Sequence, residues 1–209
     1  MKDDVILGIR GCTKVFGGLT AVQDVSTDVH SGEILGLIGP NGAGKTTLLN
    51  LIAGVFPPTT GDILLEGRSI VGFKPSQRVK AGIARTFQIP KPFLDLTVLE
   101  NVHTAALFGR NVKALSTGEA MKLALETLEV VDLSGKAGQK GSTLNLAQRK
   151  RLELARALAT QPKVLLLDEV MGGLNLKEID FVMGLVKQVN RGGCTCLLYT
   201  SPSPRDRTR

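Results

Sequence analysis

The residue types with the most specific chemistry stand together in one short run: Gly39, Pro40, Asn41, Gly42, Ala43, Gly44, Lys45 and Thr46. The run fits the pattern G-x-x-x-x-G-K-[ST], in which glycines allow backbone N–H groups to approach phosphate oxygens closely. In this pattern Lys45 supplies a positive charge for the β- and γ-phosphates, and the Thr46 hydroxyl can ligate Mg²⁺. With phosphate contacts that extend to Thr47, the run predicts a site for a nucleoside triphosphate.

The segments on both sides of this run support the prediction. Residues 33–38 are apolar enough for a strand buried on both faces, and residues 45–54 have the pattern of a helix that ends at a glycine. A strand, a glycine loop and a helix in that order place unpaired N–H groups at a helix N-terminus, where the helix dipole favours phosphate anions. The run is therefore interpreted as a phosphate-binding loop rather than a generic cluster of glycines.

A second motif adds two carboxylates. The apolar segment 164–167 reads as a buried strand and is followed directly by Asp168 and Glu169. In an open α/β fold these acids emerge at the carboxyl edge of the sheet, where such folds bind their ligands. Asp168 would hold Mg²⁺ directly or through water, and Glu169 would polarise the attacking water. Taken alone, the pair could be a solvated acidic turn, but the phosphate-binding loop favours the catalytic interpretation.

Two further segments lie between these motifs. Residues 85–88, Arg-Thr-Phe-Gln, follow a short predicted strand, and residues 144–158 directly precede the acidic strand. The order and spacing of the motifs resemble the ATP-binding subunit of ABC transporters from residue 5 to about residue 195. The resemblance implies that Gln88 is the Q-loop glutamine, which contacts Mg²⁺ and the γ-phosphate. It implies a catalytic set of Lys45, Gln88 and Glu169.

The same resemblance places residues 144–148 at the signature segment, which contacts the nucleotide bound by the opposite subunit of a dimer. The contact residues would be Asn145, Ala147 and Gln148. The usual signature is L-S-G-G-Q, so Asn145 replaces a serine and Ala147 replaces a glycine. Asn145 can still donate a hydrogen bond and is a good N-cap, whereas Ala147 lacks the conformational freedom of glycine. Asn175 replaces the usual aspartate of the D-loop, and we expect a weaker or differently shaped contact across the dimer.

Finer details resemble the LivG-type ATPases of branched-chain amino-acid importers, in residues 14–22, 84–88, 96–102 and 167–175. The implied function is an ATP-binding and ATP-hydrolysing subunit that powers such an importer. Related systems for urea uptake or lipopolysaccharide export, and a soluble ABC-type ATPase that acts on DNA or ribosomes, are the alternatives. Phe16 takes the position of the aromatic residue that stacks on adenine, although it also fits an ordinary edge-strand core position.

The end of the chain departs from this pattern. Residues 196–206, Cys-Leu-Leu-Tyr-Thr-Ser-Pro-Ser-Pro-Arg-Asp, are identical to the translation of a transposase sequencing-library adapter. We therefore expect an ABC domain over residues 1–195, incomplete at its C-terminus, and a non-native tail over 196–209 that is left out of the fold prediction. The truncation would remove the last core strand of the family. The switch histidine would also be missing, because the two histidines, His30 and His103, lie upstream of the acidic strand. The chain could then bind ATP without efficient hydrolysis.

The predicted fold class is α/β: a RecA-like core with an antiparallel β-subdomain and an inserted helical subdomain at about residues 90–160. Strands are expected near 5–13, 21–30, 33–38, 62–66, 83–87 and 164–168, and helices near 45–54, 98–108, 118–131, 145–159 and 177–190. Gln88 would be the hinge that couples nucleotide state to the insert. The apolar residues Pro90, Pro92, Phe93 and Leu94 would form part of a groove for a coupling helix of a membrane subunit, or a satellite core cluster.

Composition sets further expectations. The 209 residues are 43% hydrophobic and contain no apolar run of the length that spans a bilayer. The expected location is cytoplasmic, on the inner face of the cell membrane through permease subunits. A second ABC ATPase subunit and, indirectly, a solute-binding protein are the other expected partners. The net charge of +7 comes from scattered bases, and with one tyrosine and no tryptophan we expect no nucleic-acid partner. The three cysteines have no paired metal-site spacing and are expected to be reduced thiols.

Overall fold

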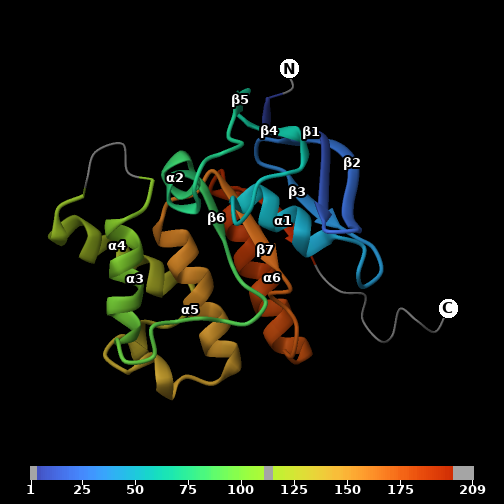
Figure 1. The fold of residues 1–209 in the computed structure, drawn as a ribbon. Coiled ribbons are helices and arrows are strands. Elements are labelled where there is room, and N and C mark those ends of the chain that lie inside the picture. The colour runs from blue at the N-terminus through green and yellow to red at the C-terminus, as the bar shows by residue number, and fades with distance from the viewer. Residues whose placement is uncertain (1–3, 111–114, 200–209) are drawn as a thin grey trace.

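Two four-stranded sheets organise the chain in the computed structural model, which describes residues 4–110 and 115–199 (Figure 1). The first sheet is antiparallel, with the order β2-β1-β4-β5. Its strands are β1 (Val5–Phe16), β2 (Leu19–His30), β4 (Thr60–Leu65) and β5 (Arg68–Ser69). A two-glycine turn after Phe16 joins β1 to β2, which is the expected connection for a tight hairpin. This sheet confirms the predicted antiparallel β-subdomain.

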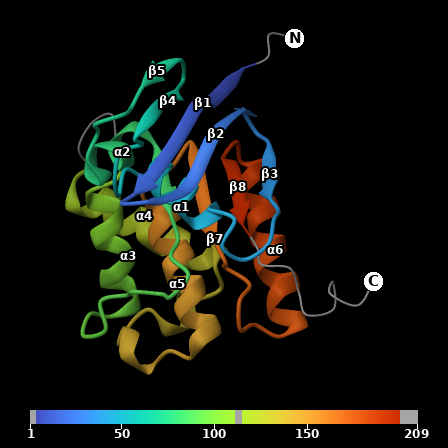
Figure 2. The same cartoon turned by 45° about the vertical axis from the view of Figure 1, so that its right-hand side comes forward.

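The second sheet is parallel and has the order β3-β8-β7-β6. Figure 2 shows β3, β8 and β7 of this sheet. Its strands are β3 (Ile34–Leu37), β8 (Thr195–Tyr199), β7 (Val164–Asp168) and β6 (Ile83–Arg85). All five residues of β7 are buried, as its apolar sequence predicts. Since the strands are parallel, their carboxyl ends meet at one edge, and Leu37, Tyr199 and Asp168 are neighbours in the register.

Strand β3 differs from the prediction of a doubly buried strand. It lies at an edge of its sheet, and its residues are alternately exposed and half-buried. Ile38, directly after the strand, is 91% exposed. An apolar run of this length is compatible with a central or an edge position, and the local sequence does not distinguish them.

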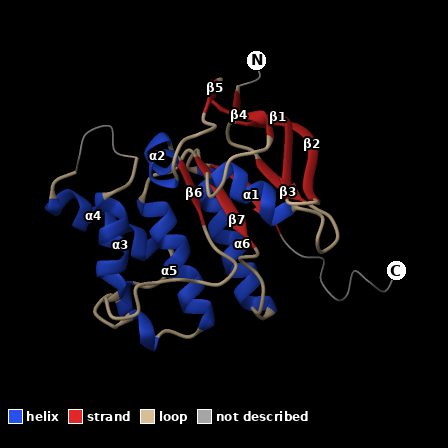
Figure 3. Cartoon of the chain, in the orientation of Figure 1, coloured by secondary structure: helices blue, strands red, loops and turns tan. Residues whose placement is uncertain are grey.

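The predicted helices are present, with bounds within one or two residues. They are α1 (Lys45–Ala53), α3 (Val98–Leu107), α4 (Thr117–Val130), α5 (Leu146–Ala159) and α6 (Leu176–Arg191). Helices α3, α4 and α5 pack on one another at one side of the molecule, as Figure 3 shows. Short 3₁₀ turns at Ser134–Lys136 and Gly141–Thr143 connect α4 to α5. Four of the helices begin with a complete capping box, which satisfies N–H groups of the first turn.

Helix α2 (Pro75–Ala81) was not predicted, and it supports the helix that follows the phosphate-binding loop. Its Arg78 is 1% exposed and donates hydrogen bonds to Leu51 O at 2.9 Å and Ile52 O at 2.7 Å. These carbonyls belong to the last turn of α1, where helical carbonyls need partners from outside the helix; Leu51 O also accepts from Gly54 N at 3.2 Å. The cation also lies at the negative end of the helix dipole. Pro75 at the start and Gly82 at the end were sequence signals for α2.

Strand β8 corrects the prediction about the tail. Residues 196–199 do not lie outside the fold; they extend β8 between β3 and β7. Cys196, Leu197 and Tyr199 are at most 5% exposed. The predicted loss of the last core strand is therefore wrong for this chain, because residues 196–199 are apolar enough to complete the buried sheet. Residues 200–209 of the predicted tail lie outside the described residues.

Candidate functional site

The phosphate-binding loop runs from β3 to α1, as the sequence predicts. Gly44 is the N-cap of α1 and has a φ of 80°, a left-handed conformation that glycine adopts without strain. A Cβ atom at Gly44 would lie 2.1 Å from Ala21 O on β2, so a side chain does not fit there. Since glycine has no side-chain acceptor, the N–H groups of the first turn of α1 are available to an anion.

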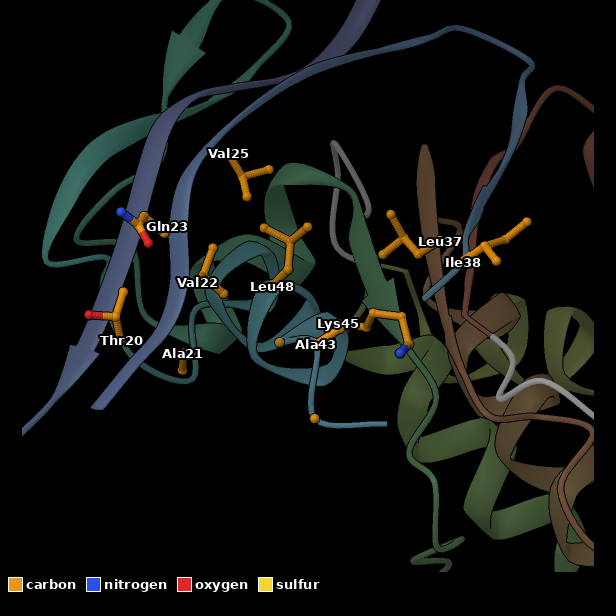
Figure 4. A pocket seen from close by; sticks show the side chains of 12 residues that line it. Thr20, Ala21, Val22, Gln23, Val25, Leu37, Ile38, Ala43, Lys45 and Leu48 are labelled. Carbon is orange, nitrogen blue, oxygen red and sulfur yellow. The ribbon is translucent and has the colours of Figure 1, made fainter. Parts of the chain in front are cut away.

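A cavity of about 390 Å³ lies beside this loop (Figure 4). The cavity is lined by Gly42 to Lys45 of the loop, by Thr20 to Gln23 of β2 on one side and by Leu37 and Ile38 on the other. The Lys45 ammonium group donates hydrogen bonds to Gly39 O at 2.7 Å and Pro40 O at 2.5 Å. Lys45 is thus bound to its own loop, and phosphate oxygens can replace these carbonyls as acceptors.

The remaining loop residues are accessible. Pro40, Asn41 and Thr46 are exposed, and Thr47 is half-buried. The Thr46 side chain lies in the first turn of α1, at the end to which the helix dipole attracts anions. This arrangement is compatible with the predicted contacts of the loop from Gly39 to Thr47.

Side-chain contacts connect the loop to the predicted catalytic acid. The Lys45 ammonium group lies 4.8 Å from the centroid of the Tyr199 ring, and the Tyr199 hydroxyl donates to Glu169 Oε1 at 2.8 Å. Gln88 Nε2 donates to the other carboxylate oxygen, Glu169 Oε2, at 2.5 Å. The structure therefore brings together Lys45, Gln88 and Glu169, which lie far apart in the sequence. Tyr199 was missed because it was assigned to the tail.

The turn after β7 fixes the position of Glu169. Its backbone has a φ of 46°, which is uncommon for a residue with a side chain. Lys150 of α5 donates to Glu169 O at 3.0 Å and to Val170 O at 3.3 Å. Burial lowers the pKa of Lys150, while Glu169 and Glu153 oppose this shift. Lys150 was not predicted as a site residue; its place in the segment before the acidic strand was the available signal.

Asp168 is more enclosed than the sequence suggests. Its carboxylate is 1% exposed, and its Oδ2 forms an ion pair with Arg85 Nη2 at 2.7 Å. The other oxygen, Oδ1, is buried without a hydrogen-bond partner among the described residues. Asp168 N–H also donates to Thr86 Oγ1 at 3.3 Å. The predicted segment 85–88 thus contacts both acids, Asp168 through Arg85 and Glu169 through Gln88.

The signature segment begins helix α5. Asn145 is its N-cap, as predicted, and accepts a hydrogen bond from Gln148 N at 2.9 Å while Gln148 Oε1 accepts from Asn145 N at 3.1 Å. Asn145 is exposed, whereas Ala147 is only 8% exposed, so any contact of Ala147 with a partner's nucleotide would involve its backbone. Asn175 caps α6 in the same way and accepts from Glu178 N.

Phe16 stands apart from the cavity. Its ring packs edge-on against Phe56, with centroids 5.1 Å apart, and the Lys14 ammonium group lies 5.1 Å from the Phe16 centroid. The ring is half-exposed and is not part of the cavity wall, which begins at Thr20. The adenine contact of Phe16 stays a prediction.

The fold and the site define a phosphate-loop nucleotide-binding protein with an acidic strand that ends at the sheet edge where the loop begins. The ABC transporter family profile matches residues 22–172. The chain therefore belongs to the ABC transporter family and is an ABC-type ATPase, which binds adenine nucleotides. No helix among residues 4–110 and 115–199 is long and apolar enough to cross a membrane.

Individual relatives agree with this assignment. The chain is 38% identical over 195 residues to the high-affinity branched-chain amino acid transport ATP-binding protein BraF of Pseudomonas aeruginosa, and the match covers 88% of the chain and 76% of BraF. It is 37% identical over 204 residues to LivG of Escherichia coli, which has the same description, with 92% and 80% covered.

Solved structures confirm the predicted fold class. The ATP-binding cassette MJ1267 of an ABC transporter superposes with a TM-score of 0.86 at 31% identity. The match covers 95% of this chain and 82% of the MJ1267 chain. MJ0796, a dimeric cassette in a post-hydrolysis state bound to ADP and Pi, has a TM-score of 0.83 at 30% identity, with 94% and 88% covered.

Proposed function

We propose that this chain is the ATP-hydrolysing subunit of an importer for branched-chain amino acids. The observation that supports hydrolysis most directly is the pair of contacts that positions Glu169, from Gln88 at 2.5 Å and from Tyr199 at 2.8 Å, at the sheet edge where the phosphate-binding loop begins. The similarity to BraF and LivG, which are branched-chain amino acid transport ATP-binding proteins, supports the cargo.

The residues divide the work between binding and water activation. The first-turn N–H groups of α1 and the Lys45 ammonium group bind the phosphates and neutralise charge that develops on the γ-phosphate. Glu169 accepts a hydrogen bond from the attacking water and polarises it. Gln88 holds the Glu169 carboxylate and reports whether a γ-phosphate is present by changing this contact. Phe16 contacts the adenine ring from the end of β1.

Oxygen donors fit Mg²⁺ as the metal partner of ATP. Thr46 has an exposed hydroxyl, Gln88 has a side-chain oxygen, and Asp168 Oδ1 is buried without a hydrogen-bond partner among the described residues. Hard cations prefer such ligands, and these three residues would hold the ion, Asp168 directly or through water. When bound, Mg²⁺ neutralises phosphate charge. Arg85 orients the Asp168 carboxylate through their ion pair.

The partners follow from the arrangement of the exposed segments. Asn145, at the exposed start of α5, contacts the nucleotide of a second ABC ATPase subunit, together with Gln148 and the backbone of Ala147. Phe87, Ile89, Phe93 and Leu94 are between 45% and 72% exposed and surround Gln88 with apolar surface. This surface is where a coupling helix of a permease subunit docks, and it attaches the ATPase to the inner face of the membrane. A solute-binding protein acts indirectly, through the permease.

A complementation experiment tests the proposed cargo. The chain is expressed in Escherichia coli cells that lack LivG, and uptake of labelled leucine is compared with uptake of labelled urea. We expect leucine uptake to be restored by the chain and not by Lys45→Ala, which removes the phosphate-binding cation. Urea uptake without leucine uptake would reject the cargo. ATP hydrolysis by the purified chain that Lys45→Ala does not reduce would reject the phosphate-binding loop itself.

A further inference from the structure

Two side chains of helix α5 hold the backbone of residues 87–91, which surround Gln88. Glu153 is only 5% exposed, and its Oε1 accepts a hydrogen bond from Phe87 N at 2.9 Å. One turn further along α5, Arg156 Nη1 donates to Lys91 O at 2.8 Å. Residues three positions apart lie on one face of a helix, so both hydrogen bonds attach the segment to the same face of α5. Gln88 lies between the two points of attachment.

The surroundings of this pair are partly enclosed. Glu153, Arg156, Arg85 and Phe87 line a cavity of about 160 Å³ between α5 and the end of β6. Glu153 Oε2 and Arg156 Nε are buried there without hydrogen-bond partners among the described residues. Burial raises the pKa of Glu153 to about 7 and lowers the pKa of Arg156. Burial of the Glu153 carboxyl and of part of the Arg156 guanidinium carries a cost, which the two backbone contacts and their mutual attraction offset.

Two aromatic rings add contacts between the same segment and nearby arginines. The Arg156 guanidinium lies 4.9 Å from the centroid of the Phe93 ring, and the Arg85 guanidinium lies 5.2 Å from the centroid of the Phe87 ring. Cations over aromatic faces at these distances attract the rings. Residues 87–93 are thus tied to α5 through backbone and side chains, and to Asp168 through Arg85.

Helix α5 connects Glu153 and Arg156 to the signature segment at its N-terminus. Asn145 caps its first turn, and the helix continues without a break to Ala159. A helix moves as a rigid rod, so a displacement of the segment around Gln88 displaces Asn145 as well. We propose that Glu153 and Arg156 are positioning residues that couple the Gln88 segment to α5, so that the nucleotide state at the phosphate-binding loop sets the position of Asn145. The inference rests on the proposed ATP site at Lys45.

Hydrogen–deuterium exchange of the full chain, with and without ATP, tests this coupling. Peptides over residues 39–47, 86–94 and 145–152 report the phosphate-binding loop, the Gln88 segment and the signature. In the wild-type chain we expect ATP to slow exchange in all of them. In Glu153→Ala, exchange in 86–94 should be about tenfold faster, and the effect of ATP on 145–152 should disappear while protection of 39–47 is kept.

Matched variants separate coupling from general destabilisation. Glu153→Gln keeps an oxygen that accepts from Phe87 N and should behave as wild type. Arg151→Gln is the control, since Arg151 lies on the same helix but contacts Asp132 and the Phe181 ring instead. It should leave the ATP effect on 145–152 unchanged.

Each outcome is decisive. If Glu153→Ala keeps the ATP effect on 145–152, the coupling is refuted. If Glu153→Ala does not fold, Arg156→Gln decides: faster exchange in 86–94 with a weakened ATP effect on 145–152 supports the proposal, and wild-type behaviour overturns it. Absence of ATP protection at 39–47 in the wild-type chain would refute the ATP site instead.

Discussion

The phosphate-binding loop and the acidic edge, by which we mean Asp168 and Glu169 at the carboxyl end of β7, are built in different ways. The loop is made from its own backbone: Gly44 adopts a left-handed conformation, and Lys45 binds the carbonyls of Gly39 and Pro40. The acidic edge depends on distant segments, because Gln88 and Tyr199 hold the side chain of Glu169 and Arg85 holds that of Asp168. A local motif can therefore specify the first region, whereas the second requires the assembled sheet.

The largest expected effect concerns the loop. Lys45→Ala removes the cation that neutralises the phosphates, and we expect ATP affinity to fall by about 100-fold or more. Titration with a fluorescent ATP analogue measures this, with Lys122→Ala as the control, because Lys122 is an exposed lysine of α4 that pairs with Glu126 and lies outside the cavity. Unchanged affinity in Lys45→Ala would show that the loop does not bind phosphate.

Glu169→Gln separates binding from chemistry at the acidic edge. The amide keeps the shape of the side chain but is a poor acceptor for the proton of the attacking water, so kcat should fall about 100-fold or more while ATP affinity stays within about threefold. ATP should also favour a dimer in this variant. Glu66→Gln is the control, since Glu66 pairs with Lys163 at the surface. Normal turnover would exclude the proposed role of Glu169.

Arg85→Met tests how far the acidic edge depends on its distant partner. Asp168 is 1% exposed, so loss of Arg85 leaves a buried carboxylate unpaired and should lower the free energy of unfolding by about 3–5 kcal/mol. The exposed pair Arg10 and Asp28 gives the contrast: Arg10→Met should cost less than about 1 kcal/mol. Urea unfolding measures both. Equal losses would contradict the distinction between the two environments.

The smallest effect is a pH dependence at Glu153. Its pKa is raised to about 7, so the folded chain binds this proton at pH values where the unfolded chain has released it. The free energy of unfolding must then decrease as pH rises from about 4.5 towards 7, by up to about 3 kcal/mol relative to Glu153→Gln. Urea titrations of both proteins at pH 5 and pH 8 test the sign. A constant difference between them would refute it.

Most elements of the fold could be predicted because their signals are local. Asn145 and Asn175 begin helices through capping boxes. Gly44 and Gly54 are the N-cap and C-cap of α1, and both have left-handed conformations. The position of a strand within its sheet has no such local signal. The composition of β3 is that of a central strand, but β3 lies at an edge of its sheet. The role of Arg78 could not be predicted either, since the carbonyls that it caps lie 26 and 27 residues away in the sequence.

The sequence by itself determined the nucleotide class, the family and the types of the candidate catalytic residues, because the phosphate-binding loop and the acidic strand are contiguous motifs with local geometry. The tertiary structure decided which side chains meet. Parallel pairing of β8 with β3 and β7 brings Tyr199 beside Leu37 and Asp168, and so beside Lys45 and Glu169. Contacts of this kind depend on strand order and register, which are fixed by packing across the whole sheet rather than by any short segment.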